Sequence, residues 1–392
     1  MHDTRSLDGI RFLLAMWVSC GHFFIIVGGS NTIDIPILSK ILANPIIAVD
    51  GFMMITGFLM AYHYFLREAK EPVNEFATGM KFVIRRLFRL YPVYLIAIIC
   101  ATLLVSQMYI NREEILIYFT GDSLTIWGGE SKHETPTPIG FVSHLLFAHG
   151  IIPGQDSTIL SVAWSLSLEM QFYVLFPILF ALLFYNKSKI MIFSVTVLAV
   201  IMSFVTLKFY THWYDMPALL IFKFPLFLLG MLMAAACLNK MKWSYFYVAA
   251  LLILPFESKM TIVAALAIMM FLFLDKLKGN LNPAVFRVIS FFRSVLSGKA
   301  AKLGADISYS LYLFHMILMP FVIKFYINLG LSKYQTLSLS FVTFIVLSIL
   351  ISYVGYVAVE KPFINLGKKV VRRLDGSKPT LIPSAARSEV GS

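Results

Sequence analysis

The stretch "LDGIRFLLAMWVSCGHFF" (residues 7–24) has the apolar character of a membrane-spanning helix, yet it contains Arg11 and His22. A helical span needs about 20 mainly apolar residues, and residues 9–28 provide them. The eleven positions from Arg11 to His22 make three helical turns and about 20°, which places both side chains on one face, about 16 Å apart. Because burying either group in a bilayer costs free energy, the pair predicts a functional site.

The same apolar character continues along the chain. Of the 392 residues, 59% are hydrophobic and 14% are charged, and the mean hydropathy is +0.80, which excludes a soluble globular domain. Continuous apolar runs favour helices over the alternating strands of a β-barrel. The sequence therefore predicts an all-α fold, a polytopic membrane helical bundle of about ten transmembrane helices, the seventh and eighth being short. The predicted spans are residues 9–28, 45–65, 82–108, 162–184, 189–207, 217–238, 243–256, 260–275, 303–327 and 335–358.

The basic residues indicate the orientation of this bundle. The net charge is +12, and most of the 33 Lys and Arg residues lie on the side of the N-terminus when the ten spans alternate. By the positive-inside rule both termini are cytoplasmic. The basic residues then meet anionic lipid or an anionic cytosolic ligand, and we expect no nucleic-acid partner. The first span is expected to remain uncleaved, because it contains Arg11 and no small-x-small cleavage site follows it.

The chain divides into two predicted parts. Residues 1–370 form the transmembrane domain, and residues 371–392 form a disordered cytoplasmic tail. A long outer segment covers residues 109–161, in which the apolar residues 140–152 are too short to span and predict an interfacial or re-entrant helix. Residues 276–302 form a long inner segment with a basic character.

Cysteine and histidine spacing gives no sign of a metal site. The three cysteines, Cys20, Cys100 and Cys237, lie in predicted spans at unrelated spacings and suggest no disulfide framework. A metal site would need convergent histidines and carboxylates. The histidines without such spacing are His2, His63, His133, His144, His149 and His212.

Two carboxylates are expected near the level of His22. Asp50 lies about five residues into the second span and Glu169 about seven residues from the outer end of the fourth. Either carboxylate would fix the tautomer of the His22 imidazole and stabilise its cation, and the sequence leaves open which one does so. Gly51 and Gly57 would permit close helix approach in the second span. The plainer interpretation of Asp50 is a marker of the membrane interface or a helix cap.

Arginines at the cytoplasmic end of the third span suggest a phosphate site. In "RRLFRLYPVY", Arg86 and Arg89 are i, i+3 neighbours on one helix face, and two guanidinium groups there make a suitable phosphate clamp. Arg85 is explained by the positive-inside rule alone. Three further polar residues in the spans are supporting candidates: His315, Tyr309 and Lys223. Trp164 and Tyr312 are interpreted as packing or interface aromatics, and Glu360 and Lys361 as interfacial residues.

Phosphate-binding arginines, a deep histidine and nearby carboxylates suit a phosphorylated cytosolic donor whose reactive end reaches into the membrane. Coenzyme A is such a donor, with its phosphates on Arg11, Arg86 and Arg89 and its thioester near His22. The histidine then acts as a general base on an acceptor hydroxyl, or accepts the acyl group briefly. A proton-coupled transporter also keeps Arg, His and Asp in its core, and this alternative stays open on the residues alone.

The order of the motifs resembles the acyltransferase-3 family of membrane acyltransferases over about residues 5–365. The family's Arg-x10-His motif falls on Arg11 and His22, and its Arg-x-x-Arg motif falls on Arg86 and Arg89. Four later or intervening blocks also match: "VDGFMMITGFLM", "AWSLSLEMQFYVLFP", "ISYSLYLFH" and "VEKPF". The second-helix block departs from the usual "D-x-F-F-x-x-S-G-F" at Met53 and Thr56, and both changes are conservative.

The resemblance implies transfer of an acyl group, most often acetyl, from cytosolic acyl-CoA to a glycan or other acceptor at the outer side. Acetyl-CoA is then a co-substrate, and no cofactor is bound permanently. His22 would be the key residue, with Asp50 or Glu169 beside it, and the acceptor would be a glycan such as lipopolysaccharide O-antigen at a bacterial inner membrane. Some members carry a C-terminal SGNH-type domain, whereas this chain has only the polar tail there. It is therefore expected to acylate the acceptor itself or to rely on a separate partner.

Overall fold

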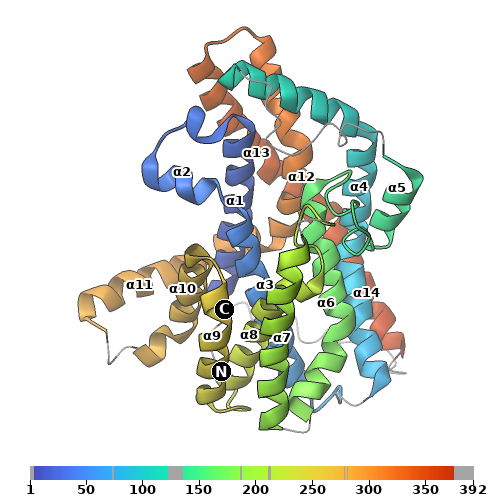
Figure 1. Cartoon of the computed structure of the whole chain (residues 1–392), viewed down its shortest axis with the longest axis vertical. Coiled ribbons are helices and arrows are strands. Elements are labelled where there is room, and N and C mark those ends of the chain that lie inside the picture. Colours follow the sequence, from blue (N-terminus) through green and yellow to red (C-terminus); the bar gives the residue numbers. More distant parts are fainter. Residues whose placement is uncertain are drawn as a thin grey trace, which may run out of the picture.

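The structure is a computed structural model that describes residues 4–72, 75–121, 136–185, 188–210, 213–277, 279 and 281–374. Across these residues the regular secondary structure is helical and includes no strand. Figure 1 shows the helices gathered in one elongated bundle, with α4 running along much of its length. The all-α fold class predicted from the sequence is confirmed.

The predicted spans correspond closely to the observed helices. Eight helical segments among the described residues are long and apolar enough to cross a membrane. The two segments predicted to be short form α9 (Trp243–Ile253), continued by η5 (Leu254–Phe256), and α10 (Lys259–Leu277). The eight longer segments are α1 (Ser6–Ile26), α3 (Ile46–Arg67), α4 (Phe76–Thr120), η3 (Ser161–Ala163) with α6 (Trp164–Phe180) and a π-helical end (Ala181–Tyr185), α7 (Lys189–Tyr210), α8 (Leu220–Cys237), α12 (Lys299–Asn328), and α13 (Lys333–Gly355) with a π-helical turn (Tyr356–Glu360) and α14 (Lys361–Leu374).

Three shorter helices lie between these segments. They are α2 (Pro36–Leu42), α5 (Pro138–Leu145) and α11 (Pro283–Leu296). Each begins with a proline, whose fixed φ and missing N–H suit the first helical position. The helix α5 overlaps the interfacial or re-entrant helix predicted over residues 140–152, and it ends earlier than expected.

The helix α4 is longer than its predicted span of residues 82–108. It contains 45 residues and continues to Thr120, so the outer segment predicted from residue 109 begins as helix. The side chain of Gln107 donates to that of Asn111 across one turn, at 2.8 Å, and supports this continuation. The helix ends at Gly121, whose φ of 78° is the left-handed conformation typical of a helix C-terminus.

A close crossing of α3 and α8 lies at the centre of the bundle. A Cβ atom added to Gly57 would lie 2.1 Å from the carbonyl oxygen of Phe227, and one added to Gly230 would lie 2.1 Å from that of Met54. Only glycine allows the two backbones to approach this closely. The close approach expected at Gly57 is therefore present, with α8 as the neighbouring helix.

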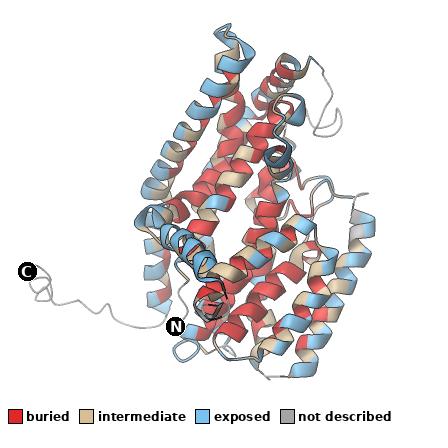
Figure 2. Cartoon of the chain, turned by 90° about the vertical axis from the view of Figure 1, so that its left-hand side faces the viewer, coloured by how far each residue is buried: buried red, intermediate tan, exposed pale blue. Residues whose placement is uncertain are grey.

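Burial separates central from peripheral helices, as Figure 2 shows by colour. In α8, 83% of the most apolar window is buried, against 17% in α7 and 22% in the α13–α14 segment. The exposed residues of α7 and α13 are nevertheless mainly apolar, as expected for surfaces that face lipid, whereas those of α14 are mostly basic or polar. The side chains in the centre, on α1, α3, α8 and α12, are shielded from lipid and can carry polar groups.

The C-terminal end differs in part from the prediction. The helix α14 continues to Leu374, so the first four residues of the predicted disordered tail are helical, and residues 375–392 lie outside the described residues. Gly367 of α14 packs against Phe88 of α4. The division into a transmembrane domain and a tail remains a prediction.

Candidate active site

The histidine of the first span lies against a histidine of α12. The helices α1 and α12 run parallel and in register, since Phe12 contacts Gly304 and His22 meets His315 ten or eleven residues further along each helix. Nδ1 of His22 and Nε2 of His315 are 2.9 Å apart, and the two rings meet edge to edge and nearly coplanar, with planes 12° apart and centroids separated by 5.1 Å. Both side chains are buried.

The hydrogen bonds of His315 determine which nitrogen carries each proton when the pair is neutral. Nδ1 of His315 lies 3.1 Å from the carbonyl oxygen of Leu311, which can only accept, so Nδ1 carries the proton and Nε2 carries the lone pair. His22 must then donate from its own Nδ1 to that Nε2. The lone pair of His22 consequently lies on Nε2, which is the arrangement that a general base or a nucleophile requires.

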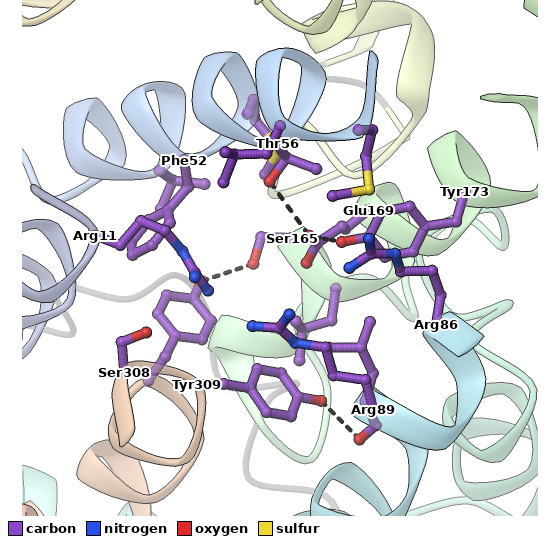
Figure 3. A pocket seen from close by; sticks show the side chains of 17 residues that line it. Arg11, Phe52, Thr56, Arg86, Arg89, Ser165, Glu169, Tyr173, Ser308 and Tyr309 are labelled. Atoms are coloured by element: carbon purple, nitrogen blue, oxygen red, sulfur yellow. Dashed lines mark hydrogen bonds between the residues drawn. The ribbon is translucent and has the colours of Figure 1, made fainter. Parts of the chain in front are cut away.

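The arginines singled out in the sequence meet in one cavity. Arg11 projects from α1 three turns before His22, and Arg86 and Arg89 project from α4 into the same space, as Figure 3 shows. The cavity has a volume of about 100 Å³. Its other polar lining residues are Thr56, Ser165, Glu169, Tyr173, Ser308, Tyr309 and Tyr312.

Glu169 lies among these arginines. Tyr173 donates a short hydrogen bond to Oε1 of Glu169, and Thr56 donates to the same atom at 3.4 Å. The guanidinium of Arg86 stacks over the Tyr173 ring, 5.5 Å from its centroid. The expectation that Glu169 lies at the level of His22 and orients it is therefore wrong, because this carboxylate belongs to the arginine cavity.

Asp50 pairs with a lysine of α8. Its Oδ1 lies 2.6 Å from Nζ of Lys223, and its Oδ2 accepts from the hydroxyl of Thr261 on α10 at 2.9 Å. The neighbouring Gly51 packs against Leu14, which precedes His22 by eight residues, or about 12 Å along α1. The predicted pairing of Asp50 with His22 is wrong, since Pro45 at the start of α3 packs against Gly21 and Asp50 lies five residues further along, below His22. Lys223 consequently lies outside the arginine cavity.

A second basic cavity, of about 260 Å³, adjoins the first and shares Met60, Arg86 and Arg89 with it. It adds two exposed cations, Arg67 and Lys368. Arg85 also lines it, but its guanidinium is held by both carboxylate oxygens of Glu71, at 2.8 and 2.6 Å. The two cavities form one basic route that runs from exposed residues to the centre of the bundle.

Two tyrosines of α12 line the inner end of this route. The hydroxyl of Tyr309 donates to the carbonyl of Leu90 at 2.9 Å, which fixes its ring in the cavity wall. The hydroxyl of Tyr312 lies 2.7 Å from that of Ser165, and its ring centroid lies 6.0 Å from that of His315. Tyr312, expected to be a packing residue, thus connects the arginine cavity with the histidine pair.

Glu360, interpreted as interfacial from its place at the end of a span, lies inside the protein rather than on its surface. Its side chain is 2% exposed, and it accepts a hydrogen bond from Ser310. Its charge interacts with those of Arg89 and Arg11. Because the π-helical turn after α13 directs it inward, the sequence position at the end of a span did not reveal its place. Lys361 is exposed, as expected.

Two further histidines form a second pair, with stacked rings, in the outer segment. His144 and His149 are fully buried, with ring centroids 3.9 Å apart. His149 donates from Nε2 to the carbonyl of Ala163 at 3.0 Å, and His144 contacts Tyr94 and Thr158. Burial lowers the pKa of His149 to about 4. Burial and the charge of the neighbouring His149 hold the pKa of His144 well below its usual range.

No group of His, Cys, Asp and Glu side chains suited to a metal ion gathers among the described residues. His2, His133 and His212 lie outside those residues. The absence of a metal remains a prediction.

Comparison with known proteins identifies the family. The acyltransferase domain that defines one protein family matches residues 4–357. No solved structure matches the chain.

Three curated relatives match about half of the chain. "Nose resistant to fluoxetine protein 6" of Caenorhabditis elegans is 24% identical over 45% of this chain and 22% of its own length. "Regulator of hypoxia-inducible factor 1" of the same organism is 26% identical over 48% and 36%. The "Putative membrane-bound transacylase BcsY" of Komagataeibacter xylinus is 27% identical over 48% and 40%. The matches therefore cover less than half the length of each relative.

Proposed function

The chain belongs to the acyltransferase family whose domain it matches over residues 4–357, and we propose that it is a membrane O-acetyltransferase. In this proposal it moves an acetyl group from cytosolic acetyl-CoA to a hydroxyl of a cell-surface glycan, such as lipopolysaccharide O-antigen, at the outer side of a bacterial inner membrane. The observation that carries the proposal is the basic route whose inner end is lined by Tyr312, with the ring of His315 in the histidine pair 6.0 Å from the Tyr312 ring.

The basic route suits a long donor with phosphates at one end. Arg86 and Arg89 line both cavities, and Arg11 lines the inner one, so phosphates can be bound where the two cavities meet. His22 lies about 16 Å further along α1 than Arg11, so the flexible arm of the donor would bring its thioester toward the imidazole. Arg85 is not part of this clamp, because Glu71 holds it.

The histidine pair suits the transfer step. Nε2 of His22 takes the proton of the acceptor hydroxyl while the oxygen attacks the thioester carbonyl carbon. The C–S bond then breaks, and the thiolate of coenzyme A leaves with that proton. His315 holds the imidazole in the required tautomer through the hydrogen bond at Nδ1, as a carboxylate does in other sites. In a second version of the step, Nε2 of His22 itself accepts the acetyl group before passing it on.

The polar side chains would also suit a proton-coupled transporter. Membership of an acyltransferase family favours the transferase, because the arginines then have a ligand and the histidine pair has a reaction. The acceptor reaches the site from the outer side, where the segment before α6 covers the bundle. The proposal also accommodates a separate partner that receives the acetyl group first. Mass spectrometry of the glycans would then identify the acceptor that this partner acetylates.

Mass spectrometry of envelope glycans tests this proposal. A strain that lacks the gene should lose one acetyl mass increment on a defined glycan, and the wild-type gene should restore it. The variant His22→Ala, produced at the same level, should not restore it. Glycans of unchanged mass in the deletion strain would contradict the proposed acceptor class.

A further inference from the structure

A third cavity lies beyond the histidine pair, on the side away from the arginine cavity. On α12, Tyr312 lines the arginine cavity and Met316 lines the third one, with His315 between them. On α4 the lining passes from Leu90 to residues 105–112, which begin about 22 Å further along the helix. The third segment shows the same order, because Ser165 and Glu169 of α6 line the arginine cavity, whereas residues 159–161, which precede α6, line the third one. The histidine pair therefore lies between the two cavities.

This outer cavity has polar groups suited to a sugar hydroxyl. Arg112 lies with its guanidinium 5.8 Å from the centroid of the Tyr109 ring, and both line the cavity with Ser161. The charge of Arg112 also acts on the imidazole of His22. The volume is about 10 Å³, which is close to the least that admits one water molecule or one hydroxyl group.

The backbone that closes the cavity is strained. Ile159 is buried and lines the cavity, and its φ is 56°. A β-branched side chain rarely adopts this left-handed conformation, and such strain persists where the surrounding structure enforces it, often at ligand sites. A sugar ring is larger than the cavity, so residues 159–161 must move outward to admit it.

We propose that this outer cavity receives the acceptor hydroxyl and that Arg112 and Ser161 hold the acceptor there. The proposal rests on the proposed function. The thioester arrives from the arginine side and the hydroxyl from the outer side, and the two meet at His22. Arg112 donates hydrogen bonds to oxygens of the sugar, while the hydroxyl loses its proton to His22 and forms the new C–O bond as the C–S bond breaks.

The variant Arg112→Gln tests this assignment in the deletion strain and as purified protein. In the strain we expect glycan acetylation to fall at least tenfold below wild type. The purified variant should bind acetyl-CoA with a Kd within twofold of wild type, since Arg112 lies far from the donor arginines. Full acetylation, or a loss of acetyl-CoA binding equal to the loss of acetylation, would overturn the assignment.

Two further variants keep the test decisive. Ser161→Ala removes one hydroxyl and should lower acetylation severalfold, even if Arg112→Gln proves to unfold; full acetylation in a folded Ser161→Ala protein would count against the proposal. Lys324→Gln is the control, because Lys324 pairs with Glu114 at 2.5 Å outside the cavity and should restore full acetylation. Failure of the proposed function looks different, since the deletion itself would then leave the glycans unchanged.

Discussion

The molecule contains two pairs of buried histidines, which occupy different kinds of place. His22 and His315 meet edge to edge in the centre of the bundle, with ring centroids 5.1 Å apart, and His144 and His149 stack 3.9 Å apart within the outer segment. Close ring contact and burial are therefore shared by both pairs. Neither feature alone distinguishes a reaction site from a structural contact.

The surroundings of the two pairs differ. His315 lies between residues that line two cavities, and cations lie on both sides of the pair. His149 instead holds the carbonyl of Ala163, and His144 contacts Tyr94, so the second pair fixes the outer segment to α4 and to η3, which leads into α6. A histidine pair is expected to do chemistry where cavities and charged groups reach it, and to stabilise the fold where backbone groups hold it.

The largest expected effect concerns Asp50, and it tests whether this residue stabilises the fold or acts on the first histidine pair. The variant Lys223→Met leaves the buried carboxylate of Asp50 without its 2.6 Å partner and should lower stability by about 3–5 kcal/mol. Thermal unfolding in detergent measures this.

The double variant Asp50→Leu with Lys223→Met should recover most of that loss. Lys240→Met is the matched control, because its pair with Glu68 is nearly half exposed and contributes at most about 1 kcal/mol. If the stability of Lys223→Met is unchanged, the pairing of Asp50 with Lys223 does not stabilise the fold, and Asp50 is again a candidate to act on His22.

Replacing His315 tests the orienting role within the first pair. His315→Leu removes the acceptor for Nδ1 of His22 and should lower kcat about 100-fold, since the imidazole loses its fixed tautomer. His315→Gln offers an amide oxygen to the same donor and should lose less than tenfold. Single-turnover transfer at saturating acetyl-CoA separates the two. Equal rates for Leu and Gln would mean that His315 only fills space.

The arginines allow the donor side to be tested separately. Arg86→Gln and Arg89→Gln should each weaken acetyl-CoA binding about tenfold, because each removes a charged hydrogen-bond donor to a phosphate. Equilibrium binding of labelled acetyl-CoA measures the change. Arg85→Gln should change the Kd less than twofold, since Glu71 holds that guanidinium. Equal losses for all three variants would point to general positive charge rather than a clamp.

The smallest expected effect concerns the second histidine pair and acid. The folded-state pKa of His149 is about 4, below the ordinary value of 6.5, so the unfolded chain binds more protons between these values. Stability should therefore fall as the pH falls through this window, by about 1 kcal/mol at pH 5.5 from His149. Hydrogen exchange of the backbone amides in residues 138–161 measures this loss of stability.

The variant His149→Phe should weaken that pH dependence and keep transfer at pH 7. Some dependence should remain, because His144 also titrates below its usual range. A transfer rate that collapsed in a folded His149→Phe protein would show that the second pair takes part in the reaction and would break the comparison.

The sequence predicted the helices and the arginines better than the partners of His22. Apolar length and helical phase are local properties, so the ten segments and the shared face of Arg11 and His22 could be predicted. The depth of Asp50 could not, because the loop and α2 between the first two spans set where α3 begins. The match of His22 with His315 depends on two helices that are 293 residues apart in the chain.

The outer cavity was also beyond sequence reasoning. Arg112 falls in the part of α4 that was predicted to be outer segment, and the contacts of this part, such as Glu114 with Lys324 of α12 and Tyr118 with Leu331, come from residues far along the chain. The one available signal was an arginine at helical spacing from apolar residues 105 and 108. It is the one arginine in the predicted outer segments, but its spacing alone indicated no ligand or reaction partner for it.

The central claim is that His22 performs transfer and does not bind the donor. The direct measurement uses purified wild-type protein and His22→Ala in membrane vesicles with labelled acetyl-CoA, and follows donor binding and label in the glycan together. We predict Kd values within twofold of each other and a transfer rate at least about 1,000-fold lower in His22→Ala. Transfer at the wild-type rate by a folded His22→Ala protein would contradict the claim.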